Sequence, residues 1–168
     1  MTAELPIPLT SPHVSVNRVR IVELPGVQLD AGVRSRRAYE LFSSQGVIEA
    51  AREQAAALGL PPEHRLDSLA TRLELPPLVS EALASADPTR RAAAENIGRR
   101  LGRNLGAILL TLHRGDAANQ AARPDWTPED WRQWAAVRRV WLGGGIASGA
   151  LGELMVREAR AMLAEANA

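Results

Sequence analysis

The stretch that most constrains the fold is residues 137–162, which read VRRVWLGGGIASGALGELMVREARAM. Residues 140–142 are β-favouring and apolar, and the three glycines at 143–145 end that run abruptly. We expect a strand over 137–142, a glycine turn and a helix over about 150–164. Glycines ahead of a helix can present bare amide groups to a ligand, and they can equally serve only to reverse the chain. The pattern alone leaves both interpretations open.

A row of glycines constrains the middle of the chain. Asp87 followed by proline is a good helix start, and an apolar stripe predicts that the helix continues to His113. Gly98, Gly102 and Gly106 lie beside that stripe at four-residue spacing. Three glycines in a helix interior cost about 2–3 kcal/mol relative to alanine. We therefore expect a second backbone packed closely against them, with a hinge or a homodimer contact as the alternative.

The rest of the chain predicts a mostly helical α/β fold with a few strands and about six helices. Residues 1–12 contain three prolines and should form an extended lead-in. Alternating apolar residues predict one bulged strand or two short strands over 13–24 and another over 27–29. Helical periodicity and capping signals predict helices over 36–42, 47–58, 66–73, 77–86 and from Thr127 through Trp134, with a polar loop at 115–125. We expect one domain overall, with residues 1–34 leading into a helical unit at 35–168.

Four tryptophans lie within sixteen residues of each other, at positions 126, 131, 134 and 141, although aromatic residues are otherwise scarce. Large aromatic side chains at this density are typical of a local core. We expect them to fix the helix near residue 131 against the strand that follows it. A stacking platform for a base or a sugar is the alternative.

Composition excludes several classes of function. The net charge of +1 draws in neither nucleic acid nor a lipid surface, and the absence of cysteine excludes disulfides and cysteine-ligated zinc. His13, His64 and His113 stand apart, so neither a zinc site nor a catalytic triad is indicated. Lysine is absent, which excludes the usual P-loop. No run is apolar enough to be a membrane span or a signal peptide, so we expect a cytoplasmic protein.

The order of a glycine-row helix, a loop, an apolar strand, a GGG turn and a helix resembles the C-terminal half of ROK-type sugar kinases, in the actin/hexokinase/Hsp70 superfamily. The matching stretches are 94–102, 137–142 and 143–149, and residues 39–51 are similar to a further helical segment of that family. The resemblance implies a ribonuclease H-like half-domain that binds ATP or ADP, with Mg²⁺, and a sugar. It implies contacts to the nucleotide from Gly143, Gly144, Gly145, Ser148 and Gly149.

The chain departs from that family at the catalytic positions. Asp30-Ala31-Gly32 follows an apolar run like a phosphate loop, but Val33 and Arg34 stand where threonine or serine is wanted. No catalytic aspartate and no zinc-binding cysteine cluster is recognisable. We therefore expect a nucleotide-binding lobe without complete catalytic machinery, which would act as a sugar kinase only with a complementary lobe. The alternative is a non-enzymatic helical module that homodimerises or binds a partner through its glycine row or its tryptophans.

Overall fold

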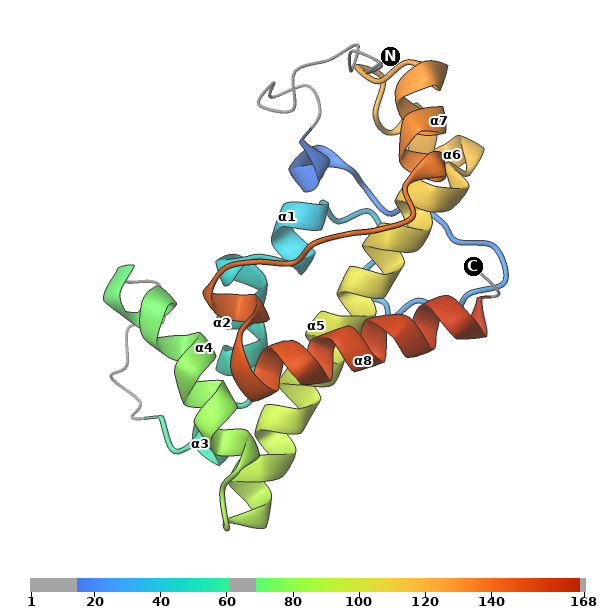
Figure 1. Ribbon diagram of the computed structural model, residues 1–168. Coiled ribbons are helices and arrows are strands. Elements are labelled where there is room, and N and C mark those ends of the chain that lie inside the picture. Colours follow the sequence, from blue (N-terminus) through green and yellow to red (C-terminus); the bar gives the residue numbers. More distant parts are fainter. Residues whose placement is uncertain (1–14, 61–68, 167–168) are drawn as a thin grey trace, which may run out of the picture.

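The computed structural model describes residues 15–60 and 69–166, and in these ranges the protein is helical and has no strand (Figure 1). The predicted lead-in at 1–12 lies outside the described residues. The elements are, in chain order, η2 (Val16–Arg18), α1 (Ala38–Leu41), α2 (Ser44–Glu53), α3 (Ala55–Leu58), α4 (Leu69–Leu83), α5 (Pro88–Arg114), α6 (Ala117–Ala121), α7 (Pro128–Ala136), η3 (Gly145–Ala147) and α8 (Gly149–Glu165).

Helix α5 runs through the whole molecule, and its predicted start is confirmed. The Asp87 carboxylate accepts hydrogen bonds from the backbone amides of Thr89 (2.8 Å) and Arg90 (3.4 Å), which satisfies donors that have no partner within the helix. Pro88 occupies the first turn, where its missing N–H costs nothing. At the other end Gly115 takes a positive φ of 54° and terminates the helix.

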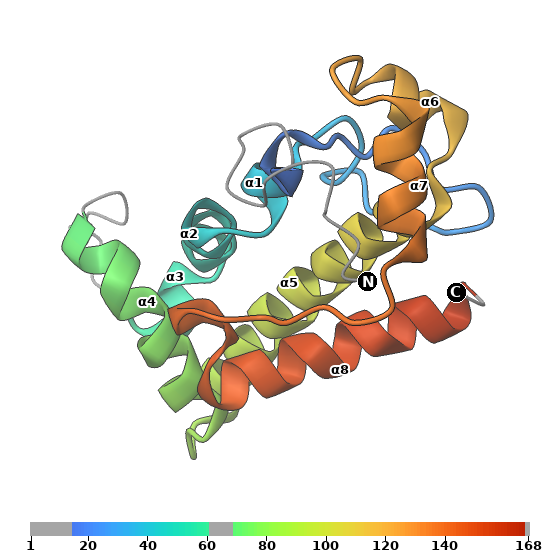
Figure 2. The same cartoon turned by 45° about the horizontal axis from the view of Figure 1, so that its top comes forward.

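Helix α8 lies along α5 and covers the glycine row (Figures 1 and 2). A Cβ atom at Gly102 would come within 2.6 Å of the Met155 carbonyl oxygen, and one at Gly106 within 3.0 Å of the Met162 sulfur. A Cβ at Gly98 would collide with Leu154. The prediction of close internal packing is confirmed, and the glycine row is consequently not an open surface.

Two hydrophobic clusters flank this helix pair. One joins α2, α3 and α4 to the first half of α5, and it includes buried Ile48, Val79 and Leu101. The other gathers around the second half of α5 and includes Ile21 and Trp131. Figure 2 shows the corresponding arrangement, with α4 near one end of α5 and α6 and α7 near the other. Residues that precede α1 thus contribute to the core.

The predicted α/β, ribonuclease H-like half-domain is wrong, because none of the three predicted strands forms in the described residues. Within 15–24 the β-type pairing among the described residues is limited to one isolated antiparallel bridge between Arg20 and Arg37, with neighbouring backbone hydrogen bonds to residues 35, 36 and 38. Val19 and Ile21 are fully buried, so their β-favouring side chains are used in the core without a sheet. Residues 27–29 and 137–142 are likewise outside regular structure. A strand needs a neighbouring strand, and no segment within 15–60 or 69–166 supplies one there.

Three local expectations also need correction. The helices expected at 66–73 and 77–86 are one helix, α4, with Pro76 and Pro77 inside it, and residues 66–68 lie outside the described residues. Pro76 and Pro77 lack the backbone N–H groups that would bond within the helix. Pro76 is buried, so its packing offsets that loss of hydrogen bonds. The helix expected over 47–58 is broken at Gln54 into α2 and α3. The loop expected at 115–125 contains the short helix α6.

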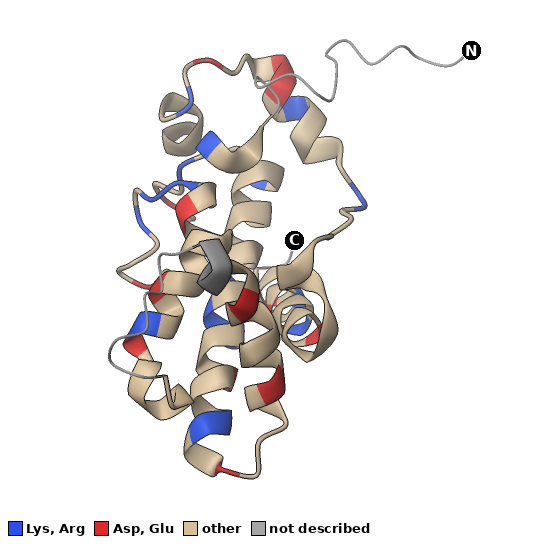
Figure 3. Ribbon diagram, turned by 90° about the vertical axis from the view of Figure 1, so that its left-hand side faces the viewer, with Lys and Arg blue, Asp and Glu red and all other residues tan. Residues whose placement is uncertain are grey.

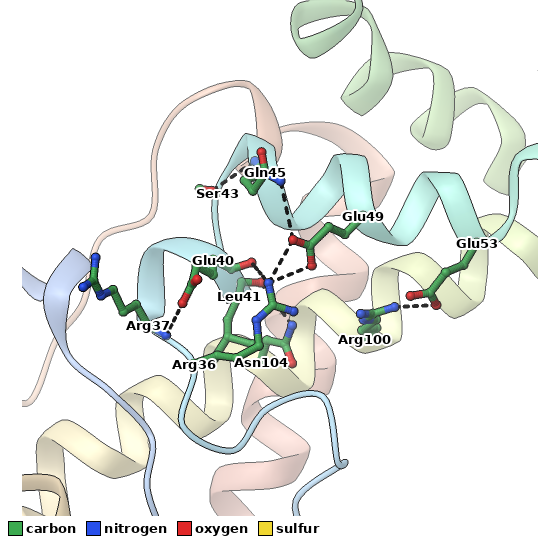
Figure 4. Close-up of polar contacts among 10 residues, drawn as sticks. All are labelled: Arg36, Arg37, Glu40, Leu41, Ser43, Gln45, Glu49, Glu53, Arg100 and Asn104. Carbon is green, nitrogen blue, oxygen red and sulfur yellow. Dashed lines mark hydrogen bonds and ion pairs between the residues drawn. The ribbon is translucent and has the colours of Figure 1, made fainter. Parts of the chain in front are cut away.

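Polar contacts join Arg36, just before α1, to α2 and join α1 to α5 (Figure 4). One guanidinium nitrogen of Arg36 donates to both carboxylate oxygens of Glu49, at 2.9 and 2.7 Å, and the buried Asn104 amide donates to the Leu41 carbonyl at 3.0 Å. Figure 3 shows acidic and basic residues interspersed over that side of the molecule. This arrangement balances charge locally and creates no patch of one sign there.

Candidate functional site

The residues predicted to contact a nucleotide lie on one surface loop, residues 143–149, which we call the glycine loop. A Cβ atom added at Gly143, Gly144 or Gly145 would meet no atom within 4 Å. Gly144 has a φ of 91° and Gly149 a φ of 64°, a backbone region that favours glycine. The Ser148 hydroxyl donates to the Gly145 carbonyl at 3.0 Å and closes the loop on itself. The loop is therefore open at Gly143, Gly144 and Gly145, whereas the Ser80 hydroxyl lies 3.5 Å from a Cβ added at Gly149.

The start of α8 is tied to α4 beside this loop. The Leu151 amide donates to the Ser80 hydroxyl oxygen at 3.2 Å, and the Gly152 amide donates to the Ser148 carbonyl at 3.4 Å. These bonds occupy two backbone N–H groups at the start of α8, which are therefore not available to bind a phosphate. The loop could still hold an anion through its remaining amides, although no described strand lies behind it to form the sheet that the resemblance implies.

The residues just before the glycine loop form an exposed, extended run at 137–142, which we call the contact segment. Figures 1 and 2 show it as the orange trace that leaves α7 and crosses to η3. Trp141 is 91% exposed, Val140 49% and Leu142 37%. The Val137 amide caps α7, and from Arg138 to Leu142 no backbone group bonds to another described backbone group. The segment thus combines strand-forming side chains with backbone donors and acceptors that bond to no described backbone group.

An apolar groove of about 460 Å³ lies alongside the contact segment. Its walls come from the second half of α5, from α7, from α8 and from the segment itself, and they comprise Leu109, Leu112, His113, Trp134, Val137, Arg138, Val140 and Leu163. Most of these side chains are aliphatic or aromatic, so the groove suits an apolar side chain. Arg138 places a positive charge beside it.

The tryptophans divide into a core group and one exposed residue. Trp126 packs edge-on against Trp131, with ring centroids 5.1 Å apart, and stacks on Trp134 at 6.0 Å. The predicted local core is confirmed for these three side chains. It is wrong for Trp141, because the strand that would have carried this side chain inward does not form.

Two buried polar residues near α6 and α7 were not predicted as important. Asn119 is fully buried, accepts from the amides of Val22 (2.8 Å) and Glu23 (3.2 Å) and donates to the Glu23 carbonyl (2.8 Å). Arg123 is 1% exposed, stacks over Trp126 at 4.4 Å and pairs with Asp125 at 3.0 Å. Burial lowers the pKa of the Arg123 guanidinium below its ordinary value, and the Asp125 carboxylate opposes that change. Both residues hold the start of the described chain and the α6–α7 corner in place.

Within residues 15–60 and 69–166 no three histidine or carboxylate side chains gather in a way that could hold a metal ion. No helix in the same ranges is both long enough and apolar enough to cross a bilayer. No family model, curated protein or solved structure matches the chain. The features that bear on function are therefore the exposed contact segment, the groove beside it and the open glycine loop.

Proposed function

We propose that this protein is a non-enzymatic interaction module that binds an extended polypeptide along its contact segment. The observation that carries the proposal is the exposed run at 137–142, in which four of six residues are apolar and the backbone from Arg138 onward lacks backbone partners among the described residues. It refines the alternative in which a partner meets the tryptophans, because only Trp141 among them stands free at the surface.

An added strand would supply hydrogen-bond partners for the backbone of the contact segment. A row of unpaired amides and carbonyls is a template for pairing with another extended chain, and such pairing gives affinity through main-chain hydrogen bonds. Valine, tryptophan and leucine are residues that fit a pleated, half-buried surface. A bound strand would cover Val140 and Trp141, which water now contacts. Removal of that apolar area from water favours binding.

The surroundings of the segment define the chemistry of the partner. The groove beside Val137 and Val140 accepts apolar side chains at alternate positions of an added strand. Arg138 and Arg139 are exposed and form no ion pair with a described residue. The module therefore suits an extended peptide in which apolar residues alternate with carboxylates.

The test is a titration of the full chain with a synthetic peptide that alternates glutamate with valine or leucine, and with its lysine counterpart as a control. The acidic peptide should shift the amide resonances of 138–142, and the lysine peptide should bind at least about tenfold more weakly because it meets two arginines. The variant Trp141→Ser should reduce the affinity for the acidic peptide. Absence of binding by either peptide at millimolar concentration would count against the proposal.

Nucleotide binding at the glycine loop is a second candidate. Its support is the open space around Gly143, Gly144 and Gly145 ahead of the α8 N-terminus. ATP or ADP, with Mg²⁺, would use the amides of that loop together with Ser148 and Gly149. A sugar and a complementary lobe belong to the same candidate, since the chain lacks a recognisable catalytic aspartate.

Calorimetric titration with ATP and with ADP tests this candidate. Gly144→Val should remove the heat of binding, because φ at this position is 91° and valine does not adopt it without strain. Gly32→Ala is the matched control, since a Cβ there has open space and the site is remote from the loop in sequence. If the wild-type protein gives no heat at millimolar nucleotide, the candidate is wrong.

A further inference from the structure

We propose that the apolar groove beside the contact segment binds an unbranched, medium-chain fatty acid, with its hydrocarbon chain in the groove and its carboxylate on Arg138. The inference goes beyond the proposed function, because such a ligand needs no pairing with the backbone of residues 137–142. Three features support it: the side chains that line the groove, the charge beside it and the way in which one guanidinium group is held there.

The size and lining of the groove suit a flexible apolar chain. Its volume of about 460 Å³ lies within the range of about 300–1,000 Å³ that is typical of small-molecule sites. Leucines 109 and 112 of α5 and Leu163 of α8 form two of its sides. Trp134 of α7 forms another, and its ring is held by stacking on Trp126. Methylene groups placed among these side chains would leave water, which favours binding.

The charge at the groove favours an anion. Arg138 and His113 are the titratable side chains among the described residues that line it, and no carboxylate is among them. Arg138 forms no ion pair with a described residue. A fatty acid carboxylate beside Arg138 would therefore gain a counter-ion, and no acidic side chain of this lining would repel it. An ammonium group at the same place would be repelled by the guanidinium.

The Arg138 guanidinium is positioned by the protein itself. Its Nη1 donates to the Ala135 carbonyl at 3.1 Å, in the last turn of α7. No other described group bonds to this guanidinium. Arginine donates through a rigid, planar fork, so its Nε and Nη2 groups can still donate together to one carboxylate. Because this side chain is already ordered, less conformational freedom is lost when a ligand binds.

Calorimetric titration of the full chain with decanoate tests the inference. Decanoate should bind saturably, once per chain, with a Kd below about 1 mM. Decylammonium has the same hydrocarbon chain with the opposite charge, and it should bind at least about tenfold more weakly. Absence of saturable decanoate binding at millimolar concentration would overturn the inference. Equal affinity for the two compounds would overturn it as well, because the carboxylate would then have no specific partner.

Two neighbouring arginines provide a matched pair of variants. Arg138→Gln should weaken decanoate binding at least about fivefold and should not weaken decylammonium binding. Arg139→Gln removes the same charge from a residue that is not among those lining the groove, and it should change the decanoate affinity less than about twofold. Both side chains are exposed, so neither variant should disturb the fold. An equal effect of the two substitutions would mean that general charge attracts decanoate, and it would overturn the assignment to Arg138.

A second pair of variants locates the hydrocarbon chain. Leu109→Trp places a larger side chain in the groove and should abolish decanoate binding. Val156→Trp is the control, because Val156 is equally half-buried but lies on α8 outside the groove, and it should leave the affinity unchanged. Undiminished binding to Leu109→Trp would show that decanoate binds elsewhere, which overturns the inference. The acidic peptide takes no part in these titrations, so the proposed function is tested separately.

Discussion

Gly102 of α5 lies directly against the backbone of Met155 in α8, so closely that a single added carbon at position 102 would stand 2.6 Å from the Met155 carbonyl oxygen. We predict that Gly102→Ala destabilises the protein by about 1–3 kcal/mol, because the clash forces α8 away from α5. The better helix propensity of alanine returns only about 1 kcal/mol. Urea denaturation measures the difference.

The control for this substitution is Gly143→Ala, at a position where a Cβ has open space. Its free energy of unfolding should equal that of the wild-type protein. If both variants unfold at the wild-type urea concentration, the close approach of the two helices does not contribute to stability as described.

Replacement of Asn119 tests the anchoring of residues 22 and 23 to α6. Asn119→Ala removes three hydrogen bonds and leaves the Val22 amide without its partner, so we expect a loss of about 2–4 kcal/mol in the free energy of unfolding. Asn17→Ala, at an exposed position, is the matched control and should change stability little. Thermal denaturation followed by circular dichroism gives both values, and equal midpoints would contradict the assignment.

The pair of Arg36 and Glu49 should be worth a measurable coupling energy. Both side chains are about a quarter exposed, and one Arg36 nitrogen contacts both carboxylate oxygens (Figure 4). A double-mutant cycle with Arg36→Ala and Glu49→Ala should give about 0.5–1 kcal/mol, decreasing as salt is added. The same cycle on Glu129 and Arg132, which are mostly exposed, should give a value near zero. Equal couplings in the two cycles would show that burial does not distinguish them.

Two tryptophans ten residues apart should respond oppositely to the same substitution. Trp131 is 4% exposed, and Trp131→Ser should cost about 3–5 kcal/mol because it leaves a cavity against Trp126. Trp141→Ser, at 91% exposure, should leave the unfolding free energy unchanged and reduce binding of the fluorescent apolar probe ANS. A large loss of stability in Trp141→Ser would mean that this side chain packs in solution.

Local signals predicted the helical part of the fold well. Asp87 followed by proline marked the start of α5, and the Thr127 and Asp130 side chains form the capping box that begins α7. Each signal acts within one turn of the helix, so the groups that interact are only two or three residues apart in the sequence. The glycine row also predicted the close approach of a second backbone, because glycines in a helix interior are destabilising unless such packing compensates for them.

The strand predictions were wrong because a strand is stabilised by a neighbouring strand, which can be distant in the sequence. The residues 140–142 have strong β preference, but no described segment pairs with them, so they remain extended and exposed. Val19 and Ile21 have the same preference, and they pack against helices instead. Local preference therefore identified the extended runs, and it could not tell which of them would form a sheet.

The candidate site was predictable only in part. The glycine loop was placed from sequence, and the positive φ of Gly144 and Gly149 agrees with the use of glycine there. The groove could not be predicted, because it combines residues from three helices with the contact segment. The burial of Asn119 and Arg123 was also beyond sequence, since both are polar and their partners depend on the folded α6–α7 corner.

The glycine row on α5 has a consequence for the order in which the protein acquires structure. During synthesis α5 leaves the ribosome well before α8, and on its own a helix with three interior glycines is weak. Its stabilising neighbour arrives only when residues 149–165 have been translated. The long central helix therefore becomes stable only after this later segment has emerged.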